Sequence, residues 1–196
     1  MKLHLGCFDQ PIEGWHNTDV TPHLVVSRLP FVPRALALLG LMDPRRLDQH
    51  RAGVFREVRY LDVGRRFPFD DGEVEAVYSS HVLEHLPRSA AVNLVRESRR
   101  VLRPGGVFRI AVPDLDRLVA AYSPEDPDGW MELLLETSQP RAKNRHHWMY
   151  NAVSLRALLA GAGFREITRR EYREGECPDV ERVDIRPDSL FMEAKK

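Results

Sequence analysis

The sequence predicts an α/β protein built around a largely parallel sheet. Strand-like and helix-like stretches alternate along the chain, and this alternation is typical of α/β folds. A nearly continuous apolar run with β-branched residues at 107–112 indicates a buried central strand. With 196 residues, of which 43% are apolar and 30% charged, the chain suits a single domain over residues 1–196 and argues against long disordered segments.

The N-terminal part is expected to contain four short strands and one helical insert. Strands are predicted at 2–5, 15–20, 57–63 and 75–79; the first ends at Gly6, the second at Asp19 and the third near Asp62. Residues 24–50 are predicted to be mostly helical, with breaks at Pro30, Pro33 and Pro44. Because too few positions separate Gly6 from Asp19 for a full helix, the first strand–helix–strand unit is expected to be shortened.

The remaining elements follow from helical periodicity and turn residues. A helix is predicted from the stripe Ala91, Leu94, Val95, Ser98, Val101 and Leu102, and it is expected to end at Pro104-Gly105-Gly106. The strand at 107–112 is followed by a helical stripe over 115–122, a short helix at 130–137 and a polar loop at 139–151. A last helix over 155–162 precedes an antiparallel pair, 165–172 and 189–195, joined by a charged segment.

Charge and cysteine content exclude several classes of protein. Lys+Arg and Asp+Glu both number 29, so no overall positive field exists to hold a nucleic-acid backbone. The two cysteines, Cys7 and Cys177, do not form a disulfide scaffold and favour a reducing compartment. No secretory signal is visible, and the uncharged stretch 35–42 is far shorter than the roughly 20 residues of a spanning helix. A soluble cytoplasmic protein without a membrane span is therefore expected.

The fold class by itself predicts where a ligand binds. In open α/β sheets, ligands lie at the carboxyl ends of the strands, where the strand order reverses. The segments to inspect are therefore 6–10, Asp19, Asp62, 80–85 and 113–114.

An ordered set of motifs resembles one enzyme family. The motifs are LHLGC (3–7) with GWHNTD (14–19), FPFDDG (67–72) leading into VYSSHVLEHL (77–86), and RVLRPGG (100–106) followed by IAVPD (110–114). Their order is similar to that of small class I S-adenosyl-L-methionine (SAM)-dependent methyltransferases. HWMY (147–150), AGF (162–164) and RPDSL (186–190) resemble a type 11-like subgroup associated with sugar and glycan biosynthesis.

The resemblance implies both a topology and a cofactor. The fold would be a Rossmann-like seven-stranded sheet of order 3-2-1-4-5-7-6, with strand 7 antiparallel and helices on both faces. The cofactor would be SAM, with Gly6-Cys7 under its methionine part, Asp19 at the ribose hydroxyls, Asp62 at the adenine and His81 at the sulfonium. The full set of cofactor-binding residues that the resemblance implies is Leu5, Gly6, Cys7, Phe8, Asp19, Val20, Asp62, Val63, Ser80 and His81.

Elementary chemistry agrees with these assignments. A ribose diol offers two O–H donors, and a carboxylate such as that of Asp19 offers two acceptor oxygens. A glycine at the turn lets the backbone approach a ligand without a Cβ clash. Aspartates at strand ends are also common as plain turn or cap residues. Phe8 stands where the family commonly has a glycine, so its ring could cover the cofactor or crowd it.

Methyl transfer from a sulfonium is an in-line displacement that needs alignment and a base to remove the acceptor's proton. The candidates for the base are His81, Asp114, His146 and His147. Trp148 and Tyr150 could stack on a sugar ring, although such aromatic residues also pack against helices. The expected activity is transfer to an oxygen of a sugar or glycan intermediate, with no metal; a secondary-metabolite acceptor on the same fold is the first alternative.

Two alternatives belong to other classes of function. Residues 81–85 match the H-x-x-E-H pattern, in which His81 and His85 on one helix face could bind zinc and Glu84 could activate water, with His146 or His147 as a third ligand. A non-catalytic module of the same fold is favoured if Phe8 blocks the pocket. The arginines of the insert, Arg28, Arg34, Arg45 and Arg46, could face a phosphate-bearing acceptor, and the insert could also be a homodimer surface or a lid.

Overall fold

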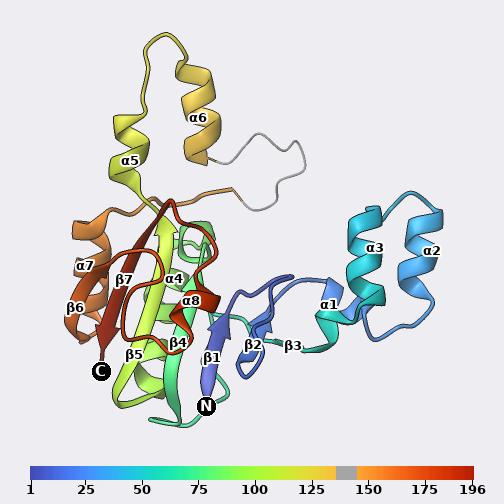
Figure 1. The fold of residues 1–196 in the computed structure, drawn as a ribbon, viewed down its shortest axis with the longest axis horizontal. Coiled ribbons are helices and arrows are strands. Elements are labelled where there is room, and N and C mark those ends of the chain that lie inside the picture. The colour runs from blue at the N-terminus through green and yellow to red at the C-terminus, as the bar shows by residue number, and fades with distance from the viewer. Residues whose placement is uncertain (136–144) are drawn as a thin grey trace.

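The computed structural model describes residues 1–135 and 145–196, and its centre is a seven-stranded sheet of order β3-β2-β1-β4-β5-β7-β6 (Figure 1). The strands are β1 (Lys2–Leu5), β2 (His16–Asp19), β3 (Val58–Tyr60), β4 (Val74–Ser80), β5 (Leu102–Pro113), β6 (Arg165–Arg170) and β7 (Ser189–Lys195). The first five pair in parallel, and β7 is antiparallel to both of its neighbours. The expected strand order and the antiparallel seventh strand are confirmed.

The chain passes from β1 to β2 without a helix, as the short spacing predicts. The insert consists of α1 (His23–Val26), α2 (Val32–Leu38), α3 (Pro44–Arg51) and the 3-10 turn η1 (Val54–Arg56). Proline interrupts it as expected: Pro33 lies in the first turn of α2, and Pro44 begins α3, where the Asp43 side chain accepts from Arg45 N at 2.8 Å. Figure 1 shows α2 and α3 side by side beyond the β3 edge of the sheet.

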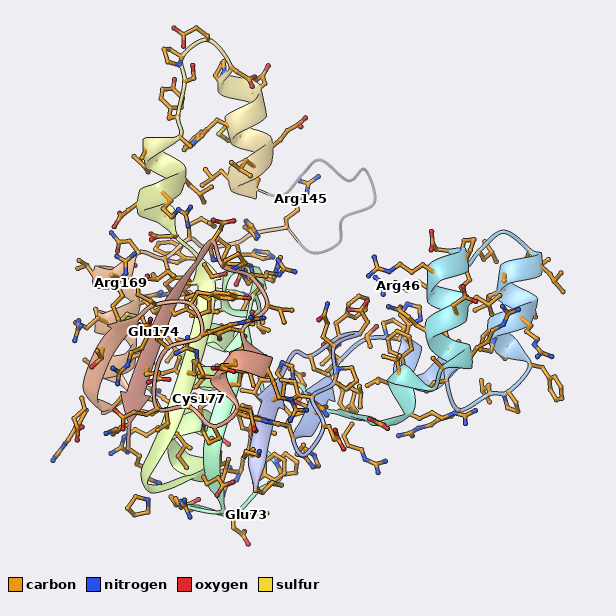
Figure 2. All side chains as sticks on the ribbon, viewed as in Figure 1. Arg46, Glu73, Arg145, Arg169, Glu174 and Cys177 are labelled. Carbon is orange, nitrogen blue, oxygen red and sulfur yellow. The ribbon has the colours of Figure 1, made fainter. Side chains whose placement is uncertain are left out.

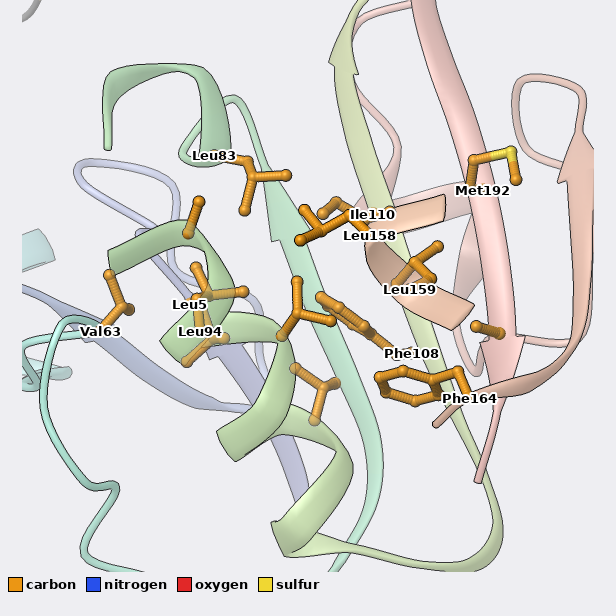
Figure 3. Close-up of a cluster of buried hydrophobic side chains, with 14 of the residues drawn as sticks. Leu5, Val63, Leu83, Leu94, Phe108, Ile110, Leu158, Leu159, Phe164 and Met192 are labelled. Atoms are coloured by element: carbon orange, nitrogen blue, oxygen red, sulfur yellow. The ribbon is translucent and has the colours of Figure 1, made fainter. Parts of the chain in front are cut away.

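Helices cover both faces of the sheet. Alternate residues of each strand point to opposite sides, so apolar side chains are present on both faces and need to be covered. On one face, α4 (Arg88–Val101) and α7 (Ala152–Gly161) pack over Leu5, Phe108 and Ile110 to form the main core (Figure 3). On the other face, Tyr78 and Val107 pack with Val183 of the short helix α8 (Val180–Val183). Helix α8 falls in the charged segment and was not predicted.

The observed helix α4 ends one residue before the end of the predicted helical stripe, which included Leu102. Leu102 is the first residue of β5 and pairs with Val74, so the helix ends at Val101. The pairing resumes at Val107 with Ala76, and the intervening residues bulge out around Gly105, whose φ is +73°. The Pro-Gly-Gly turn therefore lies inside a bulged strand instead of ahead of it.

Between β5 and α7 lie α5 (Leu115–Ala120) and α6 (Pro127–Leu135), which extend beyond the carboxyl end of β5 in Figure 1. Helix α6 begins three residues earlier than the predicted helix at 130–137, and positions 136 and 137 lie outside the described residues, as do 139–144 of the predicted loop. Among the described helices, none combines the length and apolar character needed to cross a bilayer.

Acidification is expected to destabilise the fold through His4 on β1. His4 is buried, and its Nδ1 lies 3.2 Å from Asn17 Oδ1; burial lowers its pKa to about 4. The unfolded chain binds this proton near pH 6.5, so between about pH 6.5 and 4 the unfolded state holds a proton that the folded state lacks. The free energy of unfolding therefore decreases as the pH is lowered from about 6.5 to 4, by up to about 3 kcal/mol. Urea unfolding of the wild type and His4→Gln at pH 7 and 4.5 measures the effect. An equal loss in both proteins would contradict it.

Candidate functional site

The carboxyl ends of the parallel strands bring the predicted segments to one edge of the sheet. Gly6 follows β1, Asp19 ends β2, Asp62 follows β3 and His81 follows β4. Neighbouring strands hold these positions next to one another: Leu5 pairs with Thr18, and Asp19 with Tyr60. This edge is the candidate cofactor site.

The loop after β1 makes a close turn at Gly6. Its φ is +68°, and a Cβ on it would lie 2.3 Å from Val82 Cγ2, so only glycine fits. Leu5 and Cys7 are buried, and Cys7 packs in a cluster with Leu24 and Phe55. Burial raises the pKa of the Cys7 thiol, as expected of an unreactive packed cysteine. The loop keeps its backbone close to the sheet, since Cys7 N donates to Thr18 O at 3.0 Å.

Phe8 has a left-handed backbone, with φ of +45°, at the position where the resemblance expects glycine. Its ring packs toward the insert: Phe55 and His23 lie beside it, and the Arg46 guanidinium lies 4.5 Å from the ring centroid. The aromatic side chain therefore joins the loop to the insert.

Asp9 adds a second tie to the insert that the sequence did not indicate. Its Oδ2 accepts hydrogen bonds from Arg46 Nη1 and from Gln49 Nε2 of α3. Figure 2 labels Arg46 on α3. Burial opposes ionisation of this carboxyl, but the Gln49 and Arg46 contacts outweigh it and hold the pKa of Asp9 below its usual value. The sequence held no local signal for this tie, since 37 positions separate Asp9 from Arg46.

The Asp19 carboxylate is held in place by backbone donors. Phe8 N donates to Oδ2 at 2.9 Å, and Thr21 N donates to Oδ1 at 2.7 Å. Burial raises the pKa of Asp19, while these two hydrogen bonds act in the opposite direction. Each oxygen keeps a further lone pair, so the oriented carboxylate can still accept from a diol. Val20, next in the chain, is exposed.

Asp62 is less enclosed than Asp19. Its Oδ1 accepts from Gly64 N at 2.9 Å, its Oδ2 lies 3.1 Å from Arg65 Nε, and 35% of the side chain is exposed. Val63 beside it is buried in the main core. Asp62 thus forms a turn and also presents an oxygen to solvent at the end of β3.

His81 stands at the end of β4, after Ser80, in a strained backbone conformation with φ of +53°. Its ring bridges two side chains: Nε2 lies 2.8 Å from Ser189 Oγ, and Nδ1 lies 3.1 Å from Glu84 Oε1. Ser189, at the start of β7, was missed because 108 positions separate it from His81.

A cleft of about 480 Å³ opens beside His81. Its lining is mostly apolar and carries a few charged side chains and the Ser189 hydroxyl. The lining residues are His81, Pro113, Asp114, Arg117, Leu118 and residues 185–189. Asp114 is buried there; it caps α5 through Asp116 N, and its Oδ2 accepts from Arg169 Nη2 at 3.2 Å. Asp114 is therefore engaged as a cap and ion-pair partner.

The remaining predicted residues lie in the segment 145–150, and they differ in how far each is exposed to solvent. His147 is exposed and Trp148 is half-exposed, with the Arg88 guanidinium 5.3 Å from the Trp148 ring centroid. Tyr150 is fully buried in the main core, and its hydroxyl accepts from Arg88 Nη1 at 3.4 Å. Trp148 is thus still reachable from solvent, whereas Tyr150 is not.

The helical arrangement suggested for the H-x-x-E-H segment is not observed. Residues 83–85 form a single 3-10 turn, η2 (Leu83–His85), and His81 precedes it with a left-handed backbone. The two imidazoles therefore do not share a face of an α-helix, and His81 is directed to Ser189 and Glu84. The structure instead gathers Glu84, His85 and His146.

Comparison with known proteins is consistent with this geometry. A family described as "Methyltransferase domain" matches residues 26–168. An uncharacterized methyltransferase of Synechocystis sp. is 25% identical over 134 residues, covering 68% of this chain and 58% of that protein. An uncharacterized 37.1 kDa protein in transposon TN4556 of Streptomyces fradiae is 37% identical over 90 residues, covering 46% of this chain and 22% of that protein. The chain thus spans less than two thirds of the length of either relative.

Solved structures share the fold at low identity. A SAM-dependent methyltransferase from Archaeoglobus fulgidus matches with a TM-score of 0.59 and 15% identity, covering 100% of this chain and 85% of that one. A SAM-dependent methyltransferase of Thermotoga maritima, described as a possible histamine N-methyltransferase, matches with a TM-score of 0.55 and 12% identity, covering 100% and 81%.

Proposed function

This chain belongs to the methyltransferase-domain family, and on that premise we propose that it is a SAM-dependent methyltransferase acting on a hydroxyl oxygen of a sugar or glycan intermediate. The observation that carries the proposal is the convergence of Gly6, Asp19 and Asp62 at the ends of three adjacent strands. One supplies a turn without a side chain, and two supply carboxylates, which suits a nucleoside with a diol and an amino group.

The residues present fit that cofactor. The Gly6 turn would lie under the methionine part, Asp19 would accept from the ribose hydroxyls and Asp62 from the adenine amino group. SAM supplies a methyl group activated on a sulfonium, so the protein's tasks are to align the acceptor and to remove its proton. Because the Phe8 ring packs toward the insert, we place it at the border of the site.

We assign proton removal to His81. Its Nε2 faces the cleft at Ser189 Oγ, and Glu84 lies at Nδ1, where a carboxylate orients an imidazole and stabilises its charged form. An acceptor hydroxyl that takes the position of the Ser189 hydroxyl would meet Nε2 directly. His147 is exposed, Asp114 already caps α5, and His146 Nδ1 is bonded to Leu134 O at 2.8 Å.

A sugar acceptor is supported by the chemistry of the cleft. Its mostly apolar lining suits the C–H face of a sugar ring, and Arg117 and Asp188, paired at 2.9 Å, offer donors and acceptors to the ring hydroxyls. The half-exposed Trp148 ring offers a stacking surface in the neighbouring segment.

Cofactor binding tests the proposal most directly. The wild type should bind SAM and S-adenosylhomocysteine in calorimetry without added metal. Asp19→Ala removes a charged acceptor and should weaken both by about 10- to 150-fold, equivalent to about 1.5–3 kcal/mol. Asp48→Ala is the control, because Asp48 is an exposed carboxylate of α3 paired with Arg51. Absence of nucleoside binding by the wild type, or unchanged affinity in Asp19→Ala, would count against the function.

A further inference from the structure

A separate group of polar side chains lies next to the cleft. Glu84 and His85 belong to η2, and His146 lies in the segment before α7. One ligand atom from each residue lies within 4.8 Å of the other two. Ligands of one zinc ion, each about 2.0–2.2 Å from the metal, lie up to about 4 Å apart. Small side-chain adjustments therefore bring the three atoms onto a single ion.

The buried carboxylate of Glu84 is the main reason to expect a cation in this group. Its side chain is 0% exposed, and among the described residues neither carboxylate oxygen accepts a well-aligned hydrogen bond. Within residues 1–135 and 145–196, His81 Nδ1, at 3.1 Å, is the one basic nitrogen within ion-pair distance of this carboxylate. Buried carboxylates are costly unless they are paired, hydrogen-bonded or coordinate a metal.

His146 is oriented as metal-binding histidines are. Its Nδ1 lies 2.8 Å from the carbonyl oxygen of Leu134, and a carbonyl can only accept, so Nδ1 carries the proton. A neutral imidazole protonated at Nδ1 is the tautomer that coordinates a metal through Nε2. A backbone carbonyl on the second nitrogen is a common support for a metal-ligating imidazole.

The backbone holds the two parts of the group together. His147 N and Trp148 N both donate to the carbonyl oxygen of Glu84, at 2.7 and 3.2 Å. The His85 and His146 rings face each other at a centroid distance of 4.9 Å and an interplanar angle of 51°. The arrangement therefore does not depend on long, exposed side chains.

We propose that Glu84, His85 and His146 bind one divalent transition-metal ion, with zinc as the ion best suited to them. Two imidazoles and one carboxylate form a donor set that catalytic zinc sites use, with the fourth position left open. Calcium and magnesium prefer oxygen ligands alone. His81 lies outside this set, because its two nitrogens face Glu84 and Ser189.

The ion's place in the reaction rests on the proposed function, whereas the site itself does not. Glu84 connects the metal group through His81 to Ser189 in the cleft. A cation bound by Glu84 would lie on the Nδ1 side of His81, whereas the proposed acceptor hydroxyl meets Nε2 on the other side of the ring. The ion would therefore act on the reaction through the contact of Glu84 with His81.

Metal titration of the chelator-stripped full chain tests the site. Zinc, competed against a chromophoric chelator, should bind at one ion per chain. Losing a ligand should cost at least as much as losing an outer-sphere partner, so His146→Ala and Glu84→Gln should each weaken binding by about 10- to 100-fold or more. The matched control is His147→Ala, which removes the adjacent exposed imidazole and should leave the affinity unchanged. Cobalt should give visible absorption bands that His146→Ala alters.

The outcomes separate this proposal from the proposed function. No stoichiometric zinc in the wild type, or equal affinity in His146→Ala, overturns the site. If Glu84→Gln does not fold, as judged by its thermal melt, His146→Ala decides alone, because His146 is partly exposed. Zinc binding without any SAM binding leaves the site standing and removes the transferase. SAM binding without zinc binding overturns the metal site and leaves the proposed transferase standing.

Discussion

Replacing Arg109 with methionine is expected to lower the free energy of unfolding by about 3–5 kcal/mol. Arg109 is 0% exposed in the middle of β5. Its Nε and Nη2 donate to Asp184, its Nη1 donates to Glu193 at 3.0 Å, and both carboxylates are buried. Methionine fills similar space but leaves the buried Asp184 carboxylate without its cation, whereas Glu193 keeps Arg170, whose Nε lies 3.0 Å from its Oε2. An uncompensated buried charge is the costly result of breaking a buried ion pair.

Urea unfolding at pH 7 measures this effect, and Arg117→Met is the control. Arg117 is an exposed arginine whose partner, Asp188, is also exposed, so its loss should cost about 0.5 kcal/mol or less. Adding Asp184→Asn to Arg109→Met should recover part of the loss, because the uncompensated charge is removed. If the double variant is less stable than Arg109→Met alone, packing rather than charge explains the effect.

Arg109 also shows where sequence reasoning about the fold stops. The run at 107–112 predicted a buried central strand, and β5 is that strand. Periodicity identifies the face a residue occupies, but the two carboxylates that make burial of Arg109 tolerable lie 75 and 84 positions away. The strand order followed from the resemblance, whereas this pairing depends on how β7 and α8 pack in three dimensions.

The candidate site also contains residues that the sequence predicted and contacts that it did not. Gly6, Asp19, Asp62 and His81 were found because each follows a parallel strand, which is a rule about topology. Ser189 lies in the motif at 186–190 and Asp9 in the segment 6–10. Their contacts with His81 and Arg46 depend on tertiary packing, which the local sequence does not indicate. The spacing of the H-x-x-E-H segment predicted a helix face, but the chain turns at His81 into a single 3-10 turn, so the grouping changed.

His81→Gln is expected to reduce kcat for methyl transfer by about 10²–10⁴-fold, the usual contribution of a positioned base. Glutamine keeps polar atoms in the cleft but cannot take up a proton near neutral pH. S-adenosylhomocysteine affinity should change little, because Asp19 and the Gly6 turn remain intact. Transfer of a labelled methyl group from SAM to a panel of monosaccharides and nucleotide sugars provides the rate, and calorimetry provides the affinity.

The comparison variants decide whether the loss reflects proton removal. His16→Gln makes the same change at the opposite end of β2, where the ring packs on Phe69, and should retain activity. Ser189→Ala should cost much less than His81→Gln, because the acceptor hydroxyl replaces Ser189 at Nε2 during turnover. A loss in His147→Gln as large as in His81→Gln would move the base to the 145–150 segment. Equal losses in kcat and in nucleoside affinity for His81→Gln would instead make His81 a residue that lines the cofactor site, because a base acts only on the reacting proton.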